Sequence, residues 1–126
     1  MKYGKIRIGQ KAELSHTITR KEVFDFIALT GDDNSVHTKG DVIVHGMLAV
    51  SFISTMIGTI LPGHGSIWMA QRLRFMLPVK INDTITIKAE VVGKDRRRKE
   101  VWMSMEVFNQ RGEQVIDCHP LIKMTE

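Results

Sequence analysis

The stretch that decides the fold is "GMLAVSFISTMIGTI" at residues 46–60. Its apolar side chains would lie around most of the circumference of a helix, and such a helix is stable only when other elements enclose it. Small residues, among them Gly46, Ala49 and Gly58, would let a sheet approach its backbone closely. The stretch is too short and too polar to span a membrane. The sequence therefore predicts a buried helix here, and no membrane partner.

Residues on either side of this helix alternate between apolar and polar, as half-buried strands do. One strand is expected before the helix, and in the first strand after it Ile67, Met69, Leu73 and Phe75 should share the buried face. Short turns between the later strands imply an antiparallel meander. The sequence thus predicts a single α+β domain over residues 1–126, in which a curled five-stranded antiparallel sheet wraps around the helix. The expected strands are residues 11–18, 66–75, 84–92, 100–108 and 113–124.

A second, amphipathic helix is expected from about residue 20 to residue 30. Thr19 and Glu22 form a capping-box pattern at its start, and Gly31 suits its end. The loop that follows reads "GDDNSVH" at residues 31–37. Asp, Asn and Ser are common turn residues, so this loop by itself favours a plain turn. The alternative is that its carboxylate and imidazole form an acid–base pair facing a pocket.

The amino-acid composition limits the classes of function that the chain can have. The 126 residues are 43% hydrophobic and 25% charged, with a net charge of +4. This mildly basic balance does not require a nucleic-acid partner, and we expect none. Cys118 is the only cysteine, so no disulfide can form within the chain, and no apolar leader segment is present. Together these features predict a cytoplasmic protein.

The motifs resemble those of the MaoC-like dehydratases, and specifically of the (R)-specific enoyl-CoA hydratases, which have the hot-dog fold. The most specific part is the Asp-x-Asn-x-x-His spacing of Asp32, Asn34 and His37, followed by "VHGM". Either half alone would be weak support. The resemblance covers nearly the whole chain, including "IGQKAELSHTITRKEVFDFIALTGDDN" at 8–34, "IVHGMLAVSFIS" at 43–54 and "LPGHGSIWMAQRLRFMLPV" at 61–79.

The chain departs from the family pattern at three places. Ser35 stands where the family usually has proline, and Asn82–Asp83 stands where Gly–Asp is usual. The connection "TKGDVI" at 38–43 is several residues shorter than the family's, which includes a short helical piece walling the acyl pocket. The resemblance therefore implies a site whose wall differs from that of its relatives.

The resemblance implies a reversible hydration of 2-enoyl-CoA. Asp32 would exchange the proton of the α-carbon, and His37 would hold and activate the water. Asn34 would orient the loop or the pair, and the backbone N–H of Gly46, at a helix N-terminus, would bind the thioester oxygen. Ser54 matches a family serine near the site, although it would serve equally well as a small packing residue. No metal and no cofactor are implied; coenzyme A enters only as part of the substrate.

Other side chains have weaker assignments. His45 is expected to begin the helix rather than to act in catalysis. The run "KDRRRKE" at 94–100 favours a solvated hairpin turn; the alternative is that Arg96, Arg97 or Arg98 contacts the phosphates of coenzyme A. A nucleic-acid-binding function would have this basic run as its only support.

Two further functions stay open beside the hydratase. One is a non-catalytic hot-dog protein that binds acyl-CoA or an acyl carrier protein, and the other is a hot-dog thioesterase. The active-site spacing speaks against the thioesterase. Because a single curled sheet leaves edges that need cover, we expect a homodimer with each pocket close to the interface.

Overall fold

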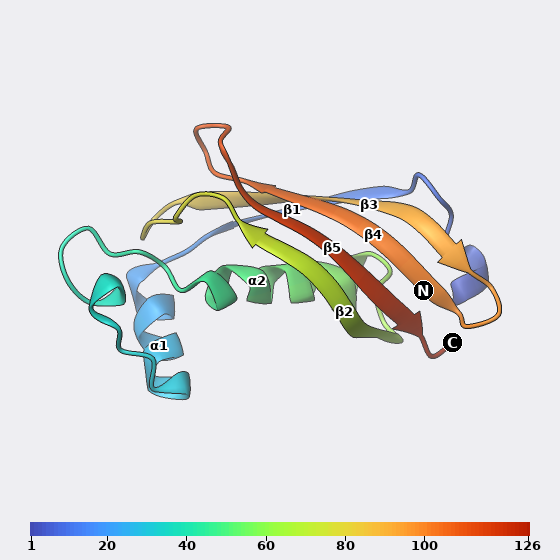
Figure 1. The fold of residues 1–126 in the computed structure, drawn as a ribbon, viewed down its shortest axis with the longest axis horizontal. Coiled ribbons are helices and arrows are strands. Elements are labelled where there is room, and N and C mark those ends of the chain that lie inside the picture. Colours follow the sequence, from blue (N-terminus) through green and yellow to red (C-terminus); the bar gives the residue numbers. More distant parts are fainter.

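A five-stranded antiparallel sheet curves over one side of a central helix in the computed structural model, which describes residues 1–126 (Figure 1). The strands lie in the order β1-β3-β4-β5-β2, so β1 and β2 form the two edges. This confirms the predicted α+β architecture. The helices are α1 (Arg20–Thr30) and α2 (Gly46–Thr55), and the strands are β1 (Lys11–Thr17), β2 (Ser66–Phe75), β3 (Thr84–Asp95), β4 (Glu100–Phe108) and β5 (Gln114–Met124).

The core lies between α2 and the concave face of the sheet. Alternate residues of β3 and β4 point inward and are fully buried, as their period-two pattern requires. They pack against the side of α2 that carries Leu48, Ala49 and Ile53. The inward residues of the two strands are Ile85, Ile87, Ala89, Val91, Val101, Met103, Met105 and Val107.

The central helix differs from expectation in two ways. Residues Met56–Ile60 continue it as a π-helical turn rather than as regular α-helix. The sheet also covers only one side of it, so that Met47, Ser51 and Ser54 on the opposite side are exposed in a single chain. The apolar pattern is nearly uniform around this helix and cannot indicate which side the sheet covers.

Strand β2 also differs from its predicted pattern. A β-bulge lies between Trp68 and Ala70, and an extra residue in one strand shifts every later side chain to the other face. Leu73 and Phe75 pair with inward-facing residues of β5, but Ile67 and Met69 are 48% and 57% exposed. The prediction that all four share a buried face is therefore wrong for Ile67 and Met69, and also for Phe75, which is 50% exposed.

Helix α1 has the predicted bounds. The Thr19 side chain accepts a hydrogen bond from the Glu22 N–H, and the Glu22 carboxylate accepts one from the Thr19 N–H, which completes the capping box. Gly31 ends the helix with a φ of 79°, a conformation that glycine adopts without a steric cost. The turn at Gly31 directs the polar loop toward the N-terminal end of α2, beside which α1 lies in Figure 1.

Candidate active site

A cavity of about 430 Å³ opens beside the N-terminus of α2. Helix α1, the loop after it, the start of α2 and the ends of β2 and β5 supply its walls. Ten of its fifteen lining residues are hydrophobic, as expected of a pocket for a small organic ligand. The lining residues are Phe26, Asp32, His37, Ile43, Val44, His45, Gly46, Met47, Ala49, Phe75, Met76, Leu77, Pro78, Val79 and Ile116.

Asp32 reaches this cavity from the loop that leaves α1. Its backbone N–H donates to the Thr30 hydroxyl at 3.2 Å, and its Oδ1 accepts from the Asn34 N–H at 3.3 Å. This second bond is the local turn that aspartate commonly forms with the backbone two residues on. The carboxylate is thus held by the turn, with its other oxygen left for a ligand.

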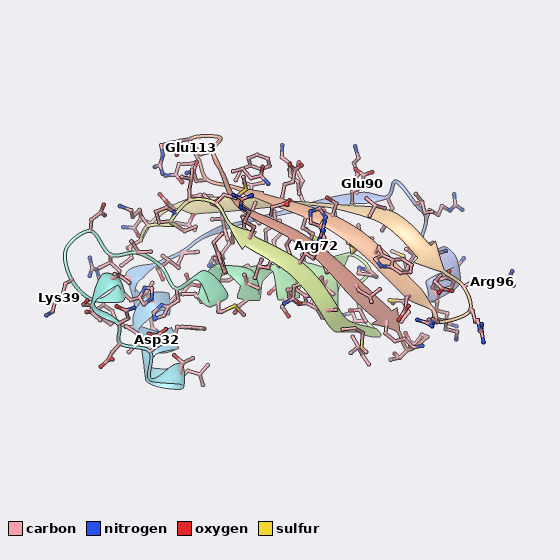
Figure 2. All side chains as sticks on the ribbon, viewed as in Figure 1. Asp32, Lys39, Arg72, Glu90, Arg96 and Glu113 are labelled. Carbon is pink, nitrogen blue, oxygen red and sulfur yellow. The ribbon has the colours of Figure 1, made fainter.

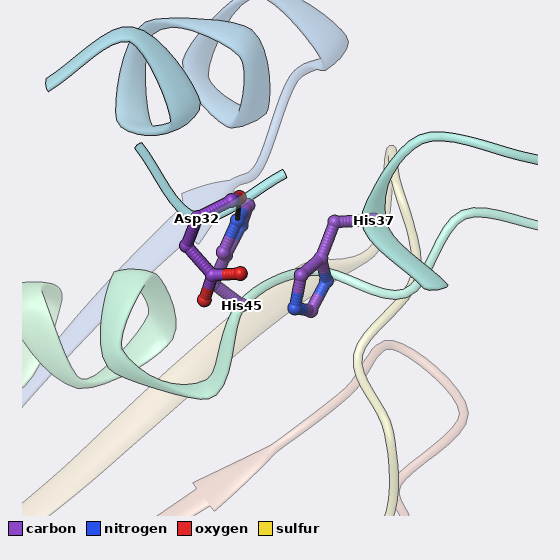
Figure 3. Close-up of side chains that lie close together, drawn as sticks. All are labelled: Asp32, His37 and His45. Carbon is purple, nitrogen blue, oxygen red and sulfur yellow. Dashed lines mark hydrogen bonds between the residues drawn. The ribbon is translucent and has the colours of Figure 1, made fainter. Parts of the chain in front are cut away.

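His37 lies at the end of the short 3₁₀ helix Ser35–His37 and is 9% exposed. Its Nδ1 faces the backbone carbonyl of Ile43, which can only accept a hydrogen bond, so Nδ1 carries the proton of the neutral ring. Its Nε2 then holds a free lone pair. Figure 3 shows this imidazole beside the Asp32 carboxylate, as an acid–base pair requires.

His45 is the residue immediately before α2, as predicted, and its side chain does not cap the helix. The ring is 2% exposed and stacks on His37, with ring centroids 3.7 Å apart and an angle of 22° between the planes. Its Nε2 lies 2.9 Å from the backbone oxygen of Asp32. No local sequence pattern indicates this contact, because it joins residues thirteen positions apart.

Asp32, His37 and His45 each place one potential ligand atom within 4.8 Å of the others. A histidine binds a metal along a lone pair in the plane of its ring, at about 2.0–2.1 Å for zinc. Stacked rings point such lone pairs side by side rather than at one position. The arrangement therefore suits proton transfer between neighbours better than coordination of one ion.

Gly46, the first residue of α2, forms the opposite wall of the cavity. The first N–H groups of a helix have no partner within it and lie at the positive end of the helix dipole. A β-carbon on Gly46 would lie 2.7 Å from Cε1 of Phe75. Glycine therefore keeps the backbone accessible between the helix and the Phe75 ring.

Two predicted site residues do not line the cavity. The amide oxygen of Asn34 accepts from the Val36 N–H at 3.3 Å and so acts on the loop backbone. Ser54 lies two turns along α2 on its exposed side. In a single chain, Asn34 can influence the acid–base pair only through the loop, and Ser54 does not reach it.

The arginine cluster lies at the other end of the sheet. Arg96, Arg97 and Arg98 form the exposed turn between β3 and β4, where the Asp95 carboxylate accepts from the N–H groups of Arg97 and Arg98. This turn neighbours Lys123 of β5, seven residues from the cavity residue Ile116, or roughly 24 Å along an extended strand. Figure 2 shows Asp32 and Arg96 at opposite ends of the molecule, while Lys39 lies at the cavity end.

Cys118 is fully buried in β5 and points into the core. Burial, together with the nearby charge of Asp117, raises the pKa of its thiol to about 11. Because the thiolate is the reactive form, this cysteine is unsuited to act as a nucleophile.

Residues 75–79 form one wall of the cavity, and they were not predicted as site residues from the sequence. Phe75, Met76 and Leu77 are each between 43% and 50% exposed and follow the end of β2. The apolar run "FMLPV" after a strand was the available signal. Only the position of α2 shows that this run faces the acid–base pair.

No helix in the structure is both long enough and apolar enough to span a membrane.

The sequence and the fold are similar to those of known proteins. The family model described as "MaoC like domain" matches residues 5–110. The (R)-specific enoyl-CoA hydratase of Rhodospirillum rubrum is 40% identical over 97 residues, which cover 70% of this chain and 67% of that protein. The enzyme of the same name from Aeromonas caviae is 34% identical over 128 residues, covering 94% of this chain and 96% of that protein.

A similar solved structure is the unliganded R-hydratase PhaJ1 from Pseudomonas aeruginosa. It superimposes with a TM-score of 0.91 and 39% identity, and the match covers 99% of this chain and 86% of that one. The fold, the family model and these relatives agree over most of the sequence. The chain therefore belongs to the MaoC-like dehydratase family and has the hot-dog fold.

Proposed function

We propose that this protein is an (R)-specific enoyl-CoA hydratase, which adds water reversibly to a 2-enoyl thioester and in reverse dehydrates a 3-hydroxyacyl-CoA. Relatives that share 34–40% identity with most of the chain carry this name. The observation that supports the chemistry is the placement of Asp32, the free Nε2 of His37 and the N-terminus of α2 around one apolar cavity. This cavity has room for an acyl chain beside the polar groups.

The proton transfers can be written for this pair. In hydration, Nε2 of His37 accepts a proton from the water that attacks the β-carbon, and a proton passes through the Asp32 carboxylate to the α-carbon. One ligand atom from each residue lies within 4.8 Å of the other, a span that a bridging water can close. The proton that His37 takes up thus replaces the one that Asp32 delivers, and both groups return to their starting state. Dehydration follows the same steps in reverse.

Negative charge develops on the thioester oxygen as the α-carbon gains enolate character. The backbone N–H groups at the start of α2 suit this charge, because preorganised donors at a helix N-terminus stabilise anions. Gly46 forms part of the cavity wall at this point. We assign the thioester oxygen to its N–H.

We infer that the reaction needs neither a metal nor a redox cofactor. Addition of water transfers no electrons between substrate and enzyme, and a carboxylate and an imidazole are sufficient to move both protons. The stacking of His37 on His45 is in keeping with this use of the site.

We also propose that the protein is a homodimer formed through the free edge of β2. That edge exposes Ile67 and Met69, and the apolar residues Phe75 and Met76 follow along it. An exposed apolar strand edge invites pairing with another chain. The lone, buried Cys118 is compatible with a reducing cytoplasm, which we propose as its location.

The direct test is the hydration of crotonyl-CoA, measured as the loss of absorbance of the conjugated thioester. Asp32→Asn and His37→Ala should each lower the rate by about 10²–10⁴-fold, the usual contribution of a general acid or base. Matched controls are Asp33→Asn, an exposed neighbour in the same loop, and His64→Ala, in an exposed turn. These two variants should keep the wild-type rate.

The same reaction mixtures separate the alternatives. Release of free thiol without hydration would indicate a thioesterase. Thermal stabilisation by acyl-CoA with neither reaction would indicate a binding protein. Wild-type rates in both site variants would contradict the assignment of Asp32 and His37. A series of longer enoyl chains then measures what the shortened connection at 38–43 does to acyl length.

A further inference from the structure

His45 belongs to both halves of the proposed site. Its backbone oxygen accepts from the N–H groups of Leu48 and Ala49, at 3.0 and 3.2 Å, and so begins α2. Its side chain turns back toward the loop that carries Asp32 and His37. One residue therefore links the helix N-terminus to the acid–base pair.

The hydrogen bond to Asp32 defines the tautomer of the His45 ring. The acceptor is a backbone carbonyl, so Nε2 of His45 must be the donor across the 2.9 Å separation. Asp32 has an exposed side chain on a loop, and this bond ties its backbone to a buried residue. The bond restrains the position from which the carboxylate enters the cavity.

Ring stacking restrains His37 in a similar way. The His45 ring lies 3.7 Å from that of His37 and 4.8 Å from that of Phe26, measured between centroids. With its Nδ1 bonded to the Ile43 carbonyl and its face against His45, the His37 ring has little freedom to rotate. Its Nε2 is thereby directed at the cavity.

The remaining nitrogen of His45 argues against a purely structural role. Nδ1 is buried and has no hydrogen-bond partner. An unpaired buried polar atom destabilises a fold, and a phenylalanine would fill the same space without one. The imidazole therefore stabilises the fold less than an apolar packing residue would, and it contacts both acid–base residues.

We propose that His45 is a positioning residue, which holds Asp32 through its backbone carbonyl and His37 through ring stacking, at a fixed distance from the Gly46 N–H. The proposal rests on the proposed hydratase function. Errors of about 1 Å in the placement of reacting groups can cost on the order of 100-fold in rate. The contribution of His45 should therefore appear in kcat more than in substrate binding.

Two variants separate the contacts of His45. His45→Phe keeps a flat ring for stacking but loses the donor to Asp32, and His45→Gln keeps an N–H donor but loses the ring. We expect His45→Phe to lower kcat for crotonyl-CoA by about 10–100-fold, with KM within about threefold of wild type. His45→Gln should recover part of the lost kcat.

His16→Phe is the matched control. His16 also stacks on an aromatic ring, at 4.0 Å from Phe52, and is hydrogen-bonded to a carboxylate, but it does not line the cavity. This variant should keep the wild-type kcat. A wild-type kcat in His45→Phe would overturn the proposal. So would losses of kcat and melting temperature that match those of His16→Phe.

Amide hydrogen exchange over residues 32–37 keeps the two proposals distinguishable. If the wild-type protein hydrates no enoyl-CoA, the hydratase function fails. Faster exchange of this loop in His45→Phe than in His16→Phe would still support positioning by His45. Unchanged exchange would overturn that role whether or not the protein is active.

Discussion

At the scale of single residues, Gly46 is the position in the site with the least space for a larger side chain. A β-carbon there would lie 2.7 and 2.8 Å from Cε1 and Cζ of Phe75. The Phe75 side chain is 50% exposed, so its ring can move outward rather than force the helix to shift. The cost of a side chain at position 46 should therefore fall on the cavity rather than on the fold.

Gly46→Ala should lower kcat/KM for crotonyl-CoA by at least about 10-fold, because the new methyl group and the displaced Phe75 ring obstruct the assigned oxyanion position. The melting temperature should change by no more than about 3 °C, since alanine favours a helix over glycine. Steady-state kinetics and thermal unfolding measure the two effects.

Gly58→Ala is the control for this substitution. Gly58 lies farther along the same helical segment, and a β-carbon there meets no atom within 4 Å. Its activity should equal that of the wild type. Equal losses in both variants would show that the effect at position 46 is not specific to the cavity.

At the scale of elements, the N-terminus of α1 is held by a small polar network. The Glu22 carboxylate accepts from the Thr19 N–H at 2.8 Å and bonds to Nε2 of His16 at 2.8 Å. Partial burial by itself raises the pKa of Glu22. The hydrogen bonds from Thr19 and His16, with the charge of His16, outweigh it and lower that pKa below its ordinary value of 4.5.

A lowered folded-state pKa means that the fold favours the carboxylate form. Its stabilisation is complete above the unfolded-state value and is lost as the pH falls through the folded-state value. Glu22→Gln keeps an oxygen for the capping box but removes the charge. We expect its melting temperature to lie about 2–4 °C below wild type at pH 7, with a smaller difference at pH 3.

Thermal unfolding across this pH range measures the effect, with Glu13→Gln as control. Glu13 is an exposed carboxylate on the neighbouring strand β1. Its substitution should produce little change at either pH. A difference between Glu22→Gln and wild type that grows toward low pH would contradict the assigned network.

At the scale of the whole molecule, one chain leaves several apolar surfaces uncovered. Strand β2 is an unpaired edge, and Ile67 and Met69 are exposed on it. On α2, Met47 is 56% exposed on the side that the sheet does not cover. A second chain that continues the sheet at β2 would cover the edge.

Charge on the β2 edge should block this pairing. We expect Met69→Glu to shift the mass measured by light scattering from twice 14.3 kDa toward 14.3 kDa. The control is Val92→Glu, because Val92 is a 48% exposed residue of the inner strand β3. It should leave the dimer intact. A dimer that survives Met69→Glu would place the interface elsewhere.

Local chemistry in the sequence predicted much of this structure. Thr19, Glu22 and Gly31 set the bounds of α1 because capping and left-handed termination depend on adjacent residues. Alternation in β3 and β4 predicted their buried faces, because the side-chain period of a strand is two. The bulge in β2 was not predictable, since it depends on pairing with β5.

For the site, the spacing of Asp32 and His37 and the glycine that begins α2 predicted side chains and a helix N-terminus that the structure brings to one cavity. The sequence by itself thus determined the proposed acid–base groups and the elements that carry them. Only the tertiary structure decided that His45 contacts both members of the pair, that residues 75–79 wall the cavity, and that Arg96, Arg97 and Arg98 lie at the far end of the sheet. Those relations join residues distant in the chain, and they arise from how the sheet curves over α2.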